Sequence, residues 1–147
     1  MAENKYVIFR LGEEKYGIPI ESVERILPDQ SVTKLPRTPK MFLGVFEIRG
    51  ETIPAIDARL RFDMEPAAEA KNFVVVMTGE GRCALRVDSV DGILNFDESE
   101  VDDSPELFES KNDAFMHGVG KKGSELTVLI DPTHVVPSTL KSKLQVA

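Results

Sequence analysis

Several residue types that support common chemistries are scarce in this chain of 147 residues. It has a single cysteine, Cys83, so no disulfide can form within the chain. Its two histidines, His117 and His134, lie seventeen positions apart, whereas a structural zinc site needs four cysteine or histidine ligands. Tryptophan is absent, which leaves few flat rings for stacking on single-stranded nucleic acid. The composition therefore predicts no disulfide, no metal site and no base-stacking surface.

Positive charge is also in short supply. The chain has 18 basic and 25 acidic residues, a formal net charge of −7 at pH 7. Proteins that bind nucleic acids or anionic membranes need a basic face, so we expect no nucleic-acid partner and no direct membrane insertion. The longest apolar runs, such as Phe73–Met77, are far too short to span a bilayer, and residues 1–5 lack the features of a signal peptide. We therefore expect a cytoplasmic protein.

The sequence contains none of the common catalytic motifs. It has no glycine-rich phosphate loop, no G-x-S-x-G and no H-E-x-x-H. Cys83 could act as a nucleophile only beside a histidine brought near by folding, and we interpret it as a small buried residue. Asp57 and Asp131 each end an apolar strand in an Ile-Asp pair, which indicates a structural cap. We predict that the protein is not an enzyme and binds no cofactor.

Most of the local pattern favours β-strands. Apolar and β-branched runs separated by glycine-containing turns predict three hairpins. Their strands are expected at Tyr6–Leu11 and Lys15–Ile20, at Phe73–Met77 and Arg82–Val87, and at Gly118–Gly120 and Glu125–Ile130.

Two short helical pieces are predicted beside these strands. The first follows the second strand, because its apolar residues recur at spacings of three and four: Ile20, Val23, Ile26 and Leu27. Pro28 would end that helix. Asp131 before Pro132 predicts a short helical turn with the aspartate as its cap.

The chain repeats itself. Residues 7–27 match residues 74–94 at an offset of 67, with seven identical positions: Val7/Val74, Gly12/Gly79, Glu13/Glu80, Ser22/Ser89, Val23/Val90, Ile26/Ile93 and Leu27/Leu94. A second match, at an offset of 74, places Gly44, Val45, Glu51, Ile56 and Asp57 on Gly118, Val119, Glu125, Ile130 and Asp131. Two matches in the same order predict two copies of one unit of about 65 residues, each a small and nearly closed barrel. A groove between the copies would be a binding site.

The densest motif runs from Gly44 to Arg59 and reads G-V-x-x-I-R-G-x-x-I-P-x-I-D-x-R. With the opening L-G-x-x-x-Y-G-I-x-I-x-x-V that starts at Leu11, it resembles the signature of CheW-like domains. These are the coupling modules of bacterial and archaeal chemotaxis systems. The resemblance covers roughly Lys5 to Val136, nearly the whole chain.

The resemblance implies an all-β fold with short helices, built as two interlocked five-stranded SH3-like β-barrel subdomains. Residues 5–136 would form a single CheW-like domain, and 137–147 a C-terminal tail. We expect the first subdomain near 7–63 and the second near 72–136, with segments shared between them.

The resemblance also implies a non-enzymatic adaptor. Such a module couples the cytoplasmic tip of chemoreceptors, the methyl-accepting chemotaxis proteins, to the regulatory domain of the histidine kinase CheA. That kinase domain has the same fold, so the two can alternate in rings at membrane-associated receptor arrays. Two alternatives stay open: an adaptor of a related motility or pilus signalling array, and a small-molecule-binding barrel that uses the groove and Cys83.

Carried over by position, the motifs indicate a set of contact residues. The receptor-binding set is Val23, Ile26, Arg49, Val90 and Ile93. Gly44 and Gly50 match glycines that serve either the kinase contact or a structural turn.

The chain departs from the family pattern near these residues. The usual asparagine before I-R-G is Glu47, and D-L-R has become Asp57-Ala58-Arg59. An acid often follows two residues after the first valine, where this chain has Arg25 and, one position earlier, Glu24. An acid there could pair with Arg49, whereas Arg25 would repel it, so the receptor contact is expected to differ.

Overall fold

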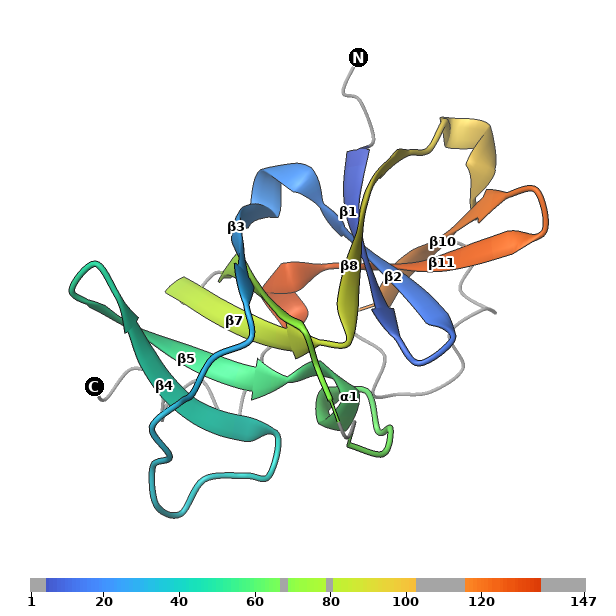
Figure 1. Ribbon diagram of the computed structural model, residues 1–147. Coiled ribbons are helices and arrows are strands. Elements are labelled where there is room, and N and C mark those ends of the chain that lie inside the picture. Colours follow the sequence, from blue (N-terminus) through green and yellow to red (C-terminus); the bar gives the residue numbers. More distant parts are fainter. Residues whose placement is uncertain (1–4, 67–68, 79–80, 103–115, 136–147) are drawn as a thin grey trace.

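The computed structural model describes residues 5–66, 69–78, 81–102 and 116–135, and its strands form two sheets (Figure 1). The six-stranded sheet has the order β8 (Ser89–Asn95), β1 (Lys5–Leu11), β2 (Glu14–Pro19), β11 (Glu125–Ile130), β10 (Met116–Lys122) and β9 (Val101–Asp102). The five-stranded sheet has the order β3 (Val23–Pro28), β6 (Asn72–Thr78), β7 (Gly81–Val87), β5 (Glu51–Asp57) and β4 (Phe42–Ile48). The predicted β-rich fold and all three hairpins are therefore confirmed.

The helices within the described ranges are single turns. They are η1 (Ile20–Ser22), α1 (Ala58–Arg61), η2 (Glu98–Glu100) and η4 (Pro132–His134). All of them are too short to cross a membrane. The expected tail at 137–147 lies outside the described residues.

The helix predicted after Ile20 is wrong. Only one 3-10 turn, η1, forms there, and the chain then continues as strand β3. The pairing of β3 with β6 contains a β-bulge between Val23 and Arg25, so one extra residue, Glu24, enters the strand. That insertion gives the apolar residues a spacing of three, which is also the spacing of a helix face.

The two sequence copies have the same structure, strand by strand. In one copy Val23 pairs with Val76 and Arg25 with Val75. In the other, Val90 pairs with Phe9 and Gly92 with Ile8, which are the positions 67 residues away, and the bulge recurs at Asp91. The later hairpins agree too, because Phe42 pairs with Ile56 as Met116 pairs with Ile130, each followed by a register shift. The repeat predicted from the sequence is thus a repeat of structure.

The copies exchange strands. The five-stranded sheet consists of one continuous stretch, residues 23–87, whereas the six-stranded sheet joins residues 5–19 to residues 89–130. Each sheet therefore draws strands from both of the ranges expected as subdomains, 7–63 and 72–136. Those boundaries stay a prediction. Parallel pairs join the exchanged parts, β2 to β11 and β7 to β5.

One hydrophobic core lies between the sheets and belongs to both. It contains Phe9, Leu11 and Ile18 of the six-stranded sheet with Val74, Val76 and Leu85 of the five-stranded sheet, all buried. Each sheet also covers a smaller core of its own. Alternation along β6 explains this, since Val74 and Val76 face the shared core while Phe73 and Val75 face the inside of their own sheet.

The two Ile-Asp pairs end their strands as caps, as predicted. The carboxylate of Asp57 accepts a hydrogen bond from the backbone N–H of Arg59 at 2.9 Å and another from that of Leu60. The carboxylate of Asp131 accepts one from the backbone N–H of Thr133 at 3.0 Å. Each aspartate thus satisfies donors that the start of a helical turn leaves without intrahelical partners.

Candidate protein-binding site

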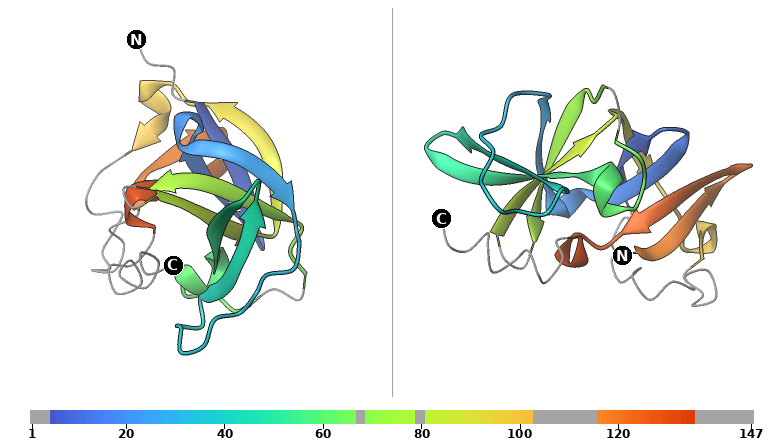
Figure 2. Two further views of the ribbon diagram at one scale, coloured as in Figure 1. Left: turned by 90° about the vertical axis from the view of Figure 1, so that its left-hand side faces the viewer. Right: turned by 90° about the horizontal axis from the view of Figure 1, so that it is seen from below.

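Strands β3 and β8 carry four of the predicted contact residues, and each strand lies at the edge of its sheet. Both lie on the near side of the molecule in Figure 1, and the left-hand view of Figure 2 places both along its right-hand margin. An edge strand has one side without a neighbour, which makes it accessible to a partner.

The bulge turns two apolar side chains of each strand toward the same face. Val23 and Ile26 lie opposite Val76 and Val74, whose side chains belong to the shared core. The equivalent residues of β8 lie opposite Phe9 and Val7. Val23, Ile26, Val90 and Ile93 therefore face the side of their sheet that is turned toward the other sheet.

The four residues differ in exposure in the same way in both copies. Val23 and Val90 are half-buried and pack against the shared core. Ile26 is 43% exposed and Ile93 is 56% exposed. Ile93 also lines a hollow of about 170 Å³ with Ile8 and Lys15. Each strand thus carries one valine that packs on the shared core and, three positions later, one isoleucine that extends into solvent. We call each of these pairs, Val23 with Ile26 and Val90 with Ile93, an apolar step.

Arg49 lies at the tip of the β4–β5 hairpin. Ile48 pairs with Glu51, so Arg49 and Gly50 form a two-residue turn, with φ angles of +50° and +84°. Positive φ at both positions is typical of a type I′ turn, which favours Asn-Gly. The Arg49 side chain is exposed and has no ion pair or hydrogen bond with any described residue.

Gly44 has a structural reason to be glycine. Its φ is +143°, and a Cβ atom there would lie 2.2 Å from the carbonyl oxygen of Thr33. The close approach comes from a bridge in which Thr33 and Val45 exchange backbone hydrogen bonds of 2.7 and 2.9 Å. A Cβ at Gly50, by contrast, would meet nothing within 4 Å, so only its φ favours glycine. A kinase contact of either glycine stays a prediction.

An arginine clamp joins three strands at the end of the five-stranded sheet where Arg49 lies. The Nε of Arg82 on β7 donates to Glu24 on β3 at 2.6 Å, and its Nη1 donates to Glu51 on β5. The other copy has the equivalent ion pair, Lys15 to Glu125, at 2.6 Å. The sequence analysis missed this clamp, although the same offsets place Arg82 on Lys15, Glu24 on Asp91 and Glu51 on Glu125, so these positions stay charged in both copies.

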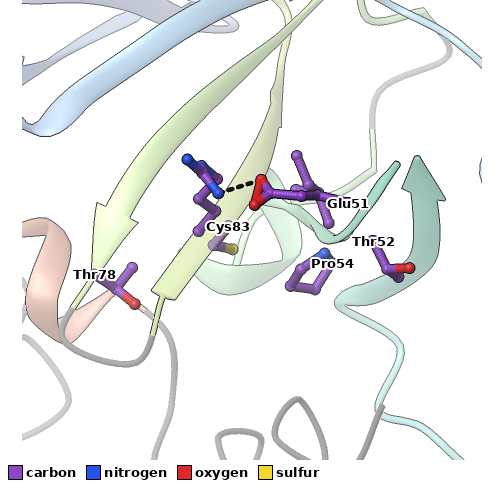
Figure 3. Close-up of a pocket in the computed structure, with 7 residues that line it drawn as sticks. Glu51, Thr52, Pro54, Thr78 and Cys83 are labelled. Atoms are coloured by element: carbon purple, nitrogen blue, oxygen red, sulfur yellow. Dashed lines mark hydrogen bonds and ion pairs between the residues drawn. The ribbon is translucent and has the colours of Figure 1, made fainter. Parts of the chain in front are cut away.

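A hollow of about 280 Å³ opens beside the clamp, between the first halves of β5 and β7 (Figure 3). Pairing of these parallel strands begins only at Ala55 and Ala84. Pro54 explains the gap, because the backbone of its partner Val45 bonds to Thr33, so the pair Val45–Pro54 turns the nitrogen of Pro54 toward β7. A proline nitrogen has no hydrogen to donate to that strand.

Cys83 lies at the bottom of this hollow, and its environment is unsuited to covalent chemistry. The side chain is buried, and burial raises the pKa of its thiol to about 12. His134 bonds to Asp131 instead, and His117 is exposed on β10. The prediction that Cys83 is a small buried residue is confirmed.

Arg59, the last residue of the motif Asp57-Ala58-Arg59, joins the two sheets. Its Nε and Nη2 donate to the carboxylate of Asp88 at 2.9 and 2.5 Å, and the backbone N–H of Gly12 donates to the same carboxylate at 2.7 Å. The hydrogen bonds from Arg59 lower the pKa of Asp88 below its ordinary value; partial burial opposes them and the Gly12 N–H adds to them. Arg59 is thus a structural tie between α1, the β1–β2 turn and the start of β8.

The comparison with family models decides the classification, since the model described as "CheW-like domain" matches residues 5–139. The chain belongs to the CheW-like domain family. A crystal structure of the scaffolding protein TtCheW from Thermoanaerobacter tengcongensis is similar, with a TM-score of 0.84 and 29% identity over 92% of this chain and 94% of the other. The resemblance seen in the sequence and the fold of two SH3-like subdomains are therefore confirmed.

Relatives of this CheW-like chain carry related names. The chemotaxis protein CheW of Klebsiella aerogenes is 30% identical over 86% of this chain and 78% of its own length. CheW of Helicobacter pylori is 28% identical, and it also aligns over 86% of this chain and 77% of its own length. The protein FrzA of Myxococcus xanthus is 42% identical over 41% of this chain and 37% of its own length. The family is one of chemotaxis scaffold proteins.

The structure brings the predicted contact residues together only in part. Val23 and Ile26 share one face of β3, and Val90 with Ile93 repeats the arrangement on β8. Arg49 lies instead at the end of the five-stranded sheet, near the clamp. Arg25 lies on the opposite face of β3 from Val23, because it pairs with Val75.

Proposed function

We propose that this protein is a non-enzymatic adaptor that couples chemoreceptors to the histidine kinase CheA. It would act in the cytoplasm, recruited to membrane-associated receptor arrays, and bind the cytoplasmic receptor tip and the kinase regulatory domain through separate surfaces. Membership of a scaffold family supports this role, as does a candidate site that offers apolar and hydrogen-bonding contacts rather than reactive groups.

The observation that carries the proposal is the pair of apolar steps on β3 and β8. Val23 and Val90 form the half-buried floor, and Ile26 and Ile93 extend from it into solvent. A helical hairpin docks by inserting apolar side chains at helical spacing into such a surface. We assign the receptor contact to these four residues and to Arg49.

The kinase contact belongs elsewhere in this proposal, because one adaptor must hold both partners at once. Gly44, on β4, is our candidate for the element that positions it, whereas Gly50 shares its turn with Arg49 and is given a structural role there. The regulatory domain of the kinase shares the CheW-like fold, so alternation of the two in rings follows from the same interfaces.

The test compares two exposed apolar residues, one inside the proposed receptor contact and one outside it. Ile93→Glu should abolish binding of a purified receptor signalling fragment, because it puts a charge into an apolar contact, and should leave binding of the kinase regulatory domain unchanged. Ile93 is 56% exposed, so the melting temperature should also stay within a few degrees. Isothermal titration calorimetry with each partner measures both affinities.

Leu126→Glu is the matched control, since Leu126 on β11 is 59% exposed and lies outside the proposed contact. It should bind both partners like the wild type. Loss of receptor binding in both variants, or in neither, would contradict the assignment of the receptor contact to these residues. A wild-type protein that binds neither partner would contradict the adaptor role itself.

A further inference from the structure

The two parts of the proposed receptor contact on the five-stranded sheet lie at opposite edges of that sheet. Val23 and Ile26 are on β3, at one edge, and Arg49 is at the tip of the β4–β5 hairpin, which forms the other edge. Strands β6 and β7 separate them in the sheet order. Their relative position therefore depends on how firmly the β4–β5 hairpin is held to β7.

Backbone pairing with β7 does not hold the tip of this hairpin. The ladder between β5 and β7 begins only at Ala55 and Ala84, so residues 51–54 pair with β4 but with no described residue of β7. Ile48 and Ile53 pack on the inner core of the sheet. An apolar contact of this kind has no preferred direction, so it does not fix the angle of the hairpin.

The other copy has the backbone pairing that this end lacks. The parallel ladder of β11 and β2 begins at Thr127 and Lys15, which correspond to Ile53 and Arg82. In the five-stranded sheet the corresponding ladder begins two residues later. Pro54 follows Ile53, and a proline nitrogen has no hydrogen to donate to the neighbouring strand.

The side chains at these positions differ in the opposite sense. Arg82 binds carboxylates on two strands, Glu24 of β3 and Glu51 of β5. Its equivalent in the other copy, Lys15, bonds to a single strand, β11, in the described part of the chain, and β8 is bound by Arg10 of β1 instead. The clamp of three strands thus occurs in the copy whose backbone ladder is interrupted.

The clamp is placed where it can fix the hairpin relative to β3. Glu24 directly follows Val23 in the sequence, and Glu51 comes directly after the turn that carries Arg49. Because the guanidinium of Arg82 is planar and rigid, it sets the direction as well as the distance between the two carboxylates that it binds. Without it, two like charges would face each other and push the hairpin away from β3.

We infer that Arg82 is a positioning residue, which holds the β4–β5 hairpin at a fixed place relative to β3 through Glu24 and Glu51. The inference rests on the proposed function and adds to it a residue outside the contact set. A surface whose parts are already in place binds without the entropic cost of ordering the hairpin. Arg82 therefore acts on receptor affinity through the position of Arg49 relative to the apolar step on β3, without contacting the receptor.

Double electron–electron resonance tests the positioning directly. Nitroxide labels at Glu47→Cys on β4 and at Glu21→Cys just before β3 occupy exposed positions, and the buried native Cys83 should stay unlabelled. The intact clamp should give a narrow distribution of distances between the two labels, and Arg82→Met should broaden it. An equally narrow distribution in both proteins would overturn the inference, because the hairpin would then be held without the clamp.

Receptor binding is the second measurement. Arg82→Met should bind a purified receptor signalling fragment about tenfold more weakly, and its melting temperature should stay within a few degrees, since partly exposed ion pairs contribute little stability. Adding Pro54→Val supplies the N–H that the ladder lacks, so it should narrow the distance distribution again and restore the affinity. A double variant with a narrow distribution but weak binding would show that Arg82 contacts the receptor itself, against the inference.

Arg86→Met is the matched control. Arg86 lies on the same strand, and its guanidinium binds Asp29 through two hydrogen bonds of 3.0 and 3.1 Å. Backbone pairing of β7 with β5 is intact there, with Asp57 opposite Arg86, so this variant should leave the distance distribution and the receptor affinity unchanged. Equal broadening and equal loss of affinity in both variants would overturn a specific role of Arg82.

The outcomes keep this inference apart from the proposed function. A wild type that binds the fragment, with an Arg82→Met variant that binds equally well, would overturn the positioning role and leave the adaptor function intact. A wild type that does not bind the fragment would contradict the adaptor function itself.

Discussion

Gly44 and Gly118 hold the same place in the two copies, yet the chain needs glycine at only one of them. Gly44 has φ +143° and lies against the carbonyl of Thr33. Gly118 does not have a positive φ. A Cβ atom added there would have a methyl of Val101 as its nearest neighbour, at an ordinary contact distance of 3.4 Å. A residue shared by two copies can thus be required by the conformation in one copy alone.

This difference gives a prediction for paired substitutions. Gly44→Ala should lower the free energy of unfolding by about 3 kcal/mol, because it combines backbone strain with a clash against the carbonyl oxygen of Thr33, a residue held in place by its two backbone hydrogen bonds with Val45. Gly118→Ala should change it by about 1 kcal/mol or less. Urea unfolding followed by circular dichroism measures both. Equal effects at the two positions would show that the Thr33 bridge yields easily.

The ion pair of Asp88 with Arg59 predicts how the stability of the fold depends on pH. Its folded-state pKa lies below the ordinary 3.8, so the carboxylate stabilises the fold at pH values above that and loses this effect as the pH falls through the lowered pKa. Asp88→Asn should therefore be less stable than the wild type near neutral pH, by about 2 kcal/mol, since Arg59 loses a charged partner. The gap should narrow below about pH 4. A gap that stays constant from neutral to acid pH would exclude the ion pair as its source.

At the scale of the element, β3 shows why a pattern misleads. Hairpins with tight turns could be predicted because each strand alternates and each turn has glycine. In β3 and β8 the bulge residue changes the spacing of face-sharing apolar residues from two to three, as between Val23 and Ile26. Periodicity alone cannot tell that spacing from a helix, and the strand partner that fixes it lies about fifty residues away in sequence.

The candidate site, like the strands, could be predicted from the sequence only in part. The repeat identified Val23, Ile26, Val90 and Ile93 as equivalent, and the structure gives them matching faces and matching exposure. The clamp on Arg82 was not predicted, because side chains on β3, β5 and β7 meet only after the strands exchange. The unbonded Nε of Arg25 likewise depends on packing that no local pattern describes.

Pro54 leads to a prediction about the gap between β5 and β7. The equivalent residue of the other copy is Val128, which pairs with Tyr16 in a continuous ladder. Pro54→Val should supply the missing N–H, extend pairing toward Ile53 and Arg82, and raise the free energy of unfolding by about 1 kcal/mol. Chemical denaturation measures the gain, and protection of the new amide hydrogen at position 54 from exchange would locate it. Destabilisation would mean that the clamp, rather than the proline, holds the strands apart.

At the scale of the whole molecule, the shared core makes the two sheets dependent on each other. Residues 23–87 contain every strand of the five-stranded sheet, but one side of that sheet packs on Phe9, Leu11 and Ile18 of the other. A fragment of this size buries too little surface to be stable when half of its core is exposed. The full chain should therefore unfold in a single transition.

A truncated protein tests this dependence. A fragment of residues 20–90 should lack a cooperative thermal transition, while the full chain should show one with equal calorimetric and van't Hoff enthalpies. The fragment and the full chain are compared by scanning calorimetry and by near-ultraviolet circular dichroism, which reports fixed aromatic packing. A fragment that melts cooperatively would show that the inner core of Phe46, Phe73 and their neighbours is sufficient.

The exchange of strands also sets an order of events on the ribosome. Because a growing chain emerges from its N-terminus, β1 and β2 leave the exit tunnel first, yet their partners β8 and β11 are made only after every strand of the five-stranded sheet. The continuous stretch 23–87 can pair its own strands while synthesis is still under way. The first hairpin waits for its neighbour β11 until translation has passed residue 130, and its apolar residues such as Phe9 and Ile18 are unprotected until the five-stranded sheet has formed. Nascent-chain chaperones that cover hydrophobic N-terminal segments would therefore find a substrate in this small protein until the five-stranded sheet has formed.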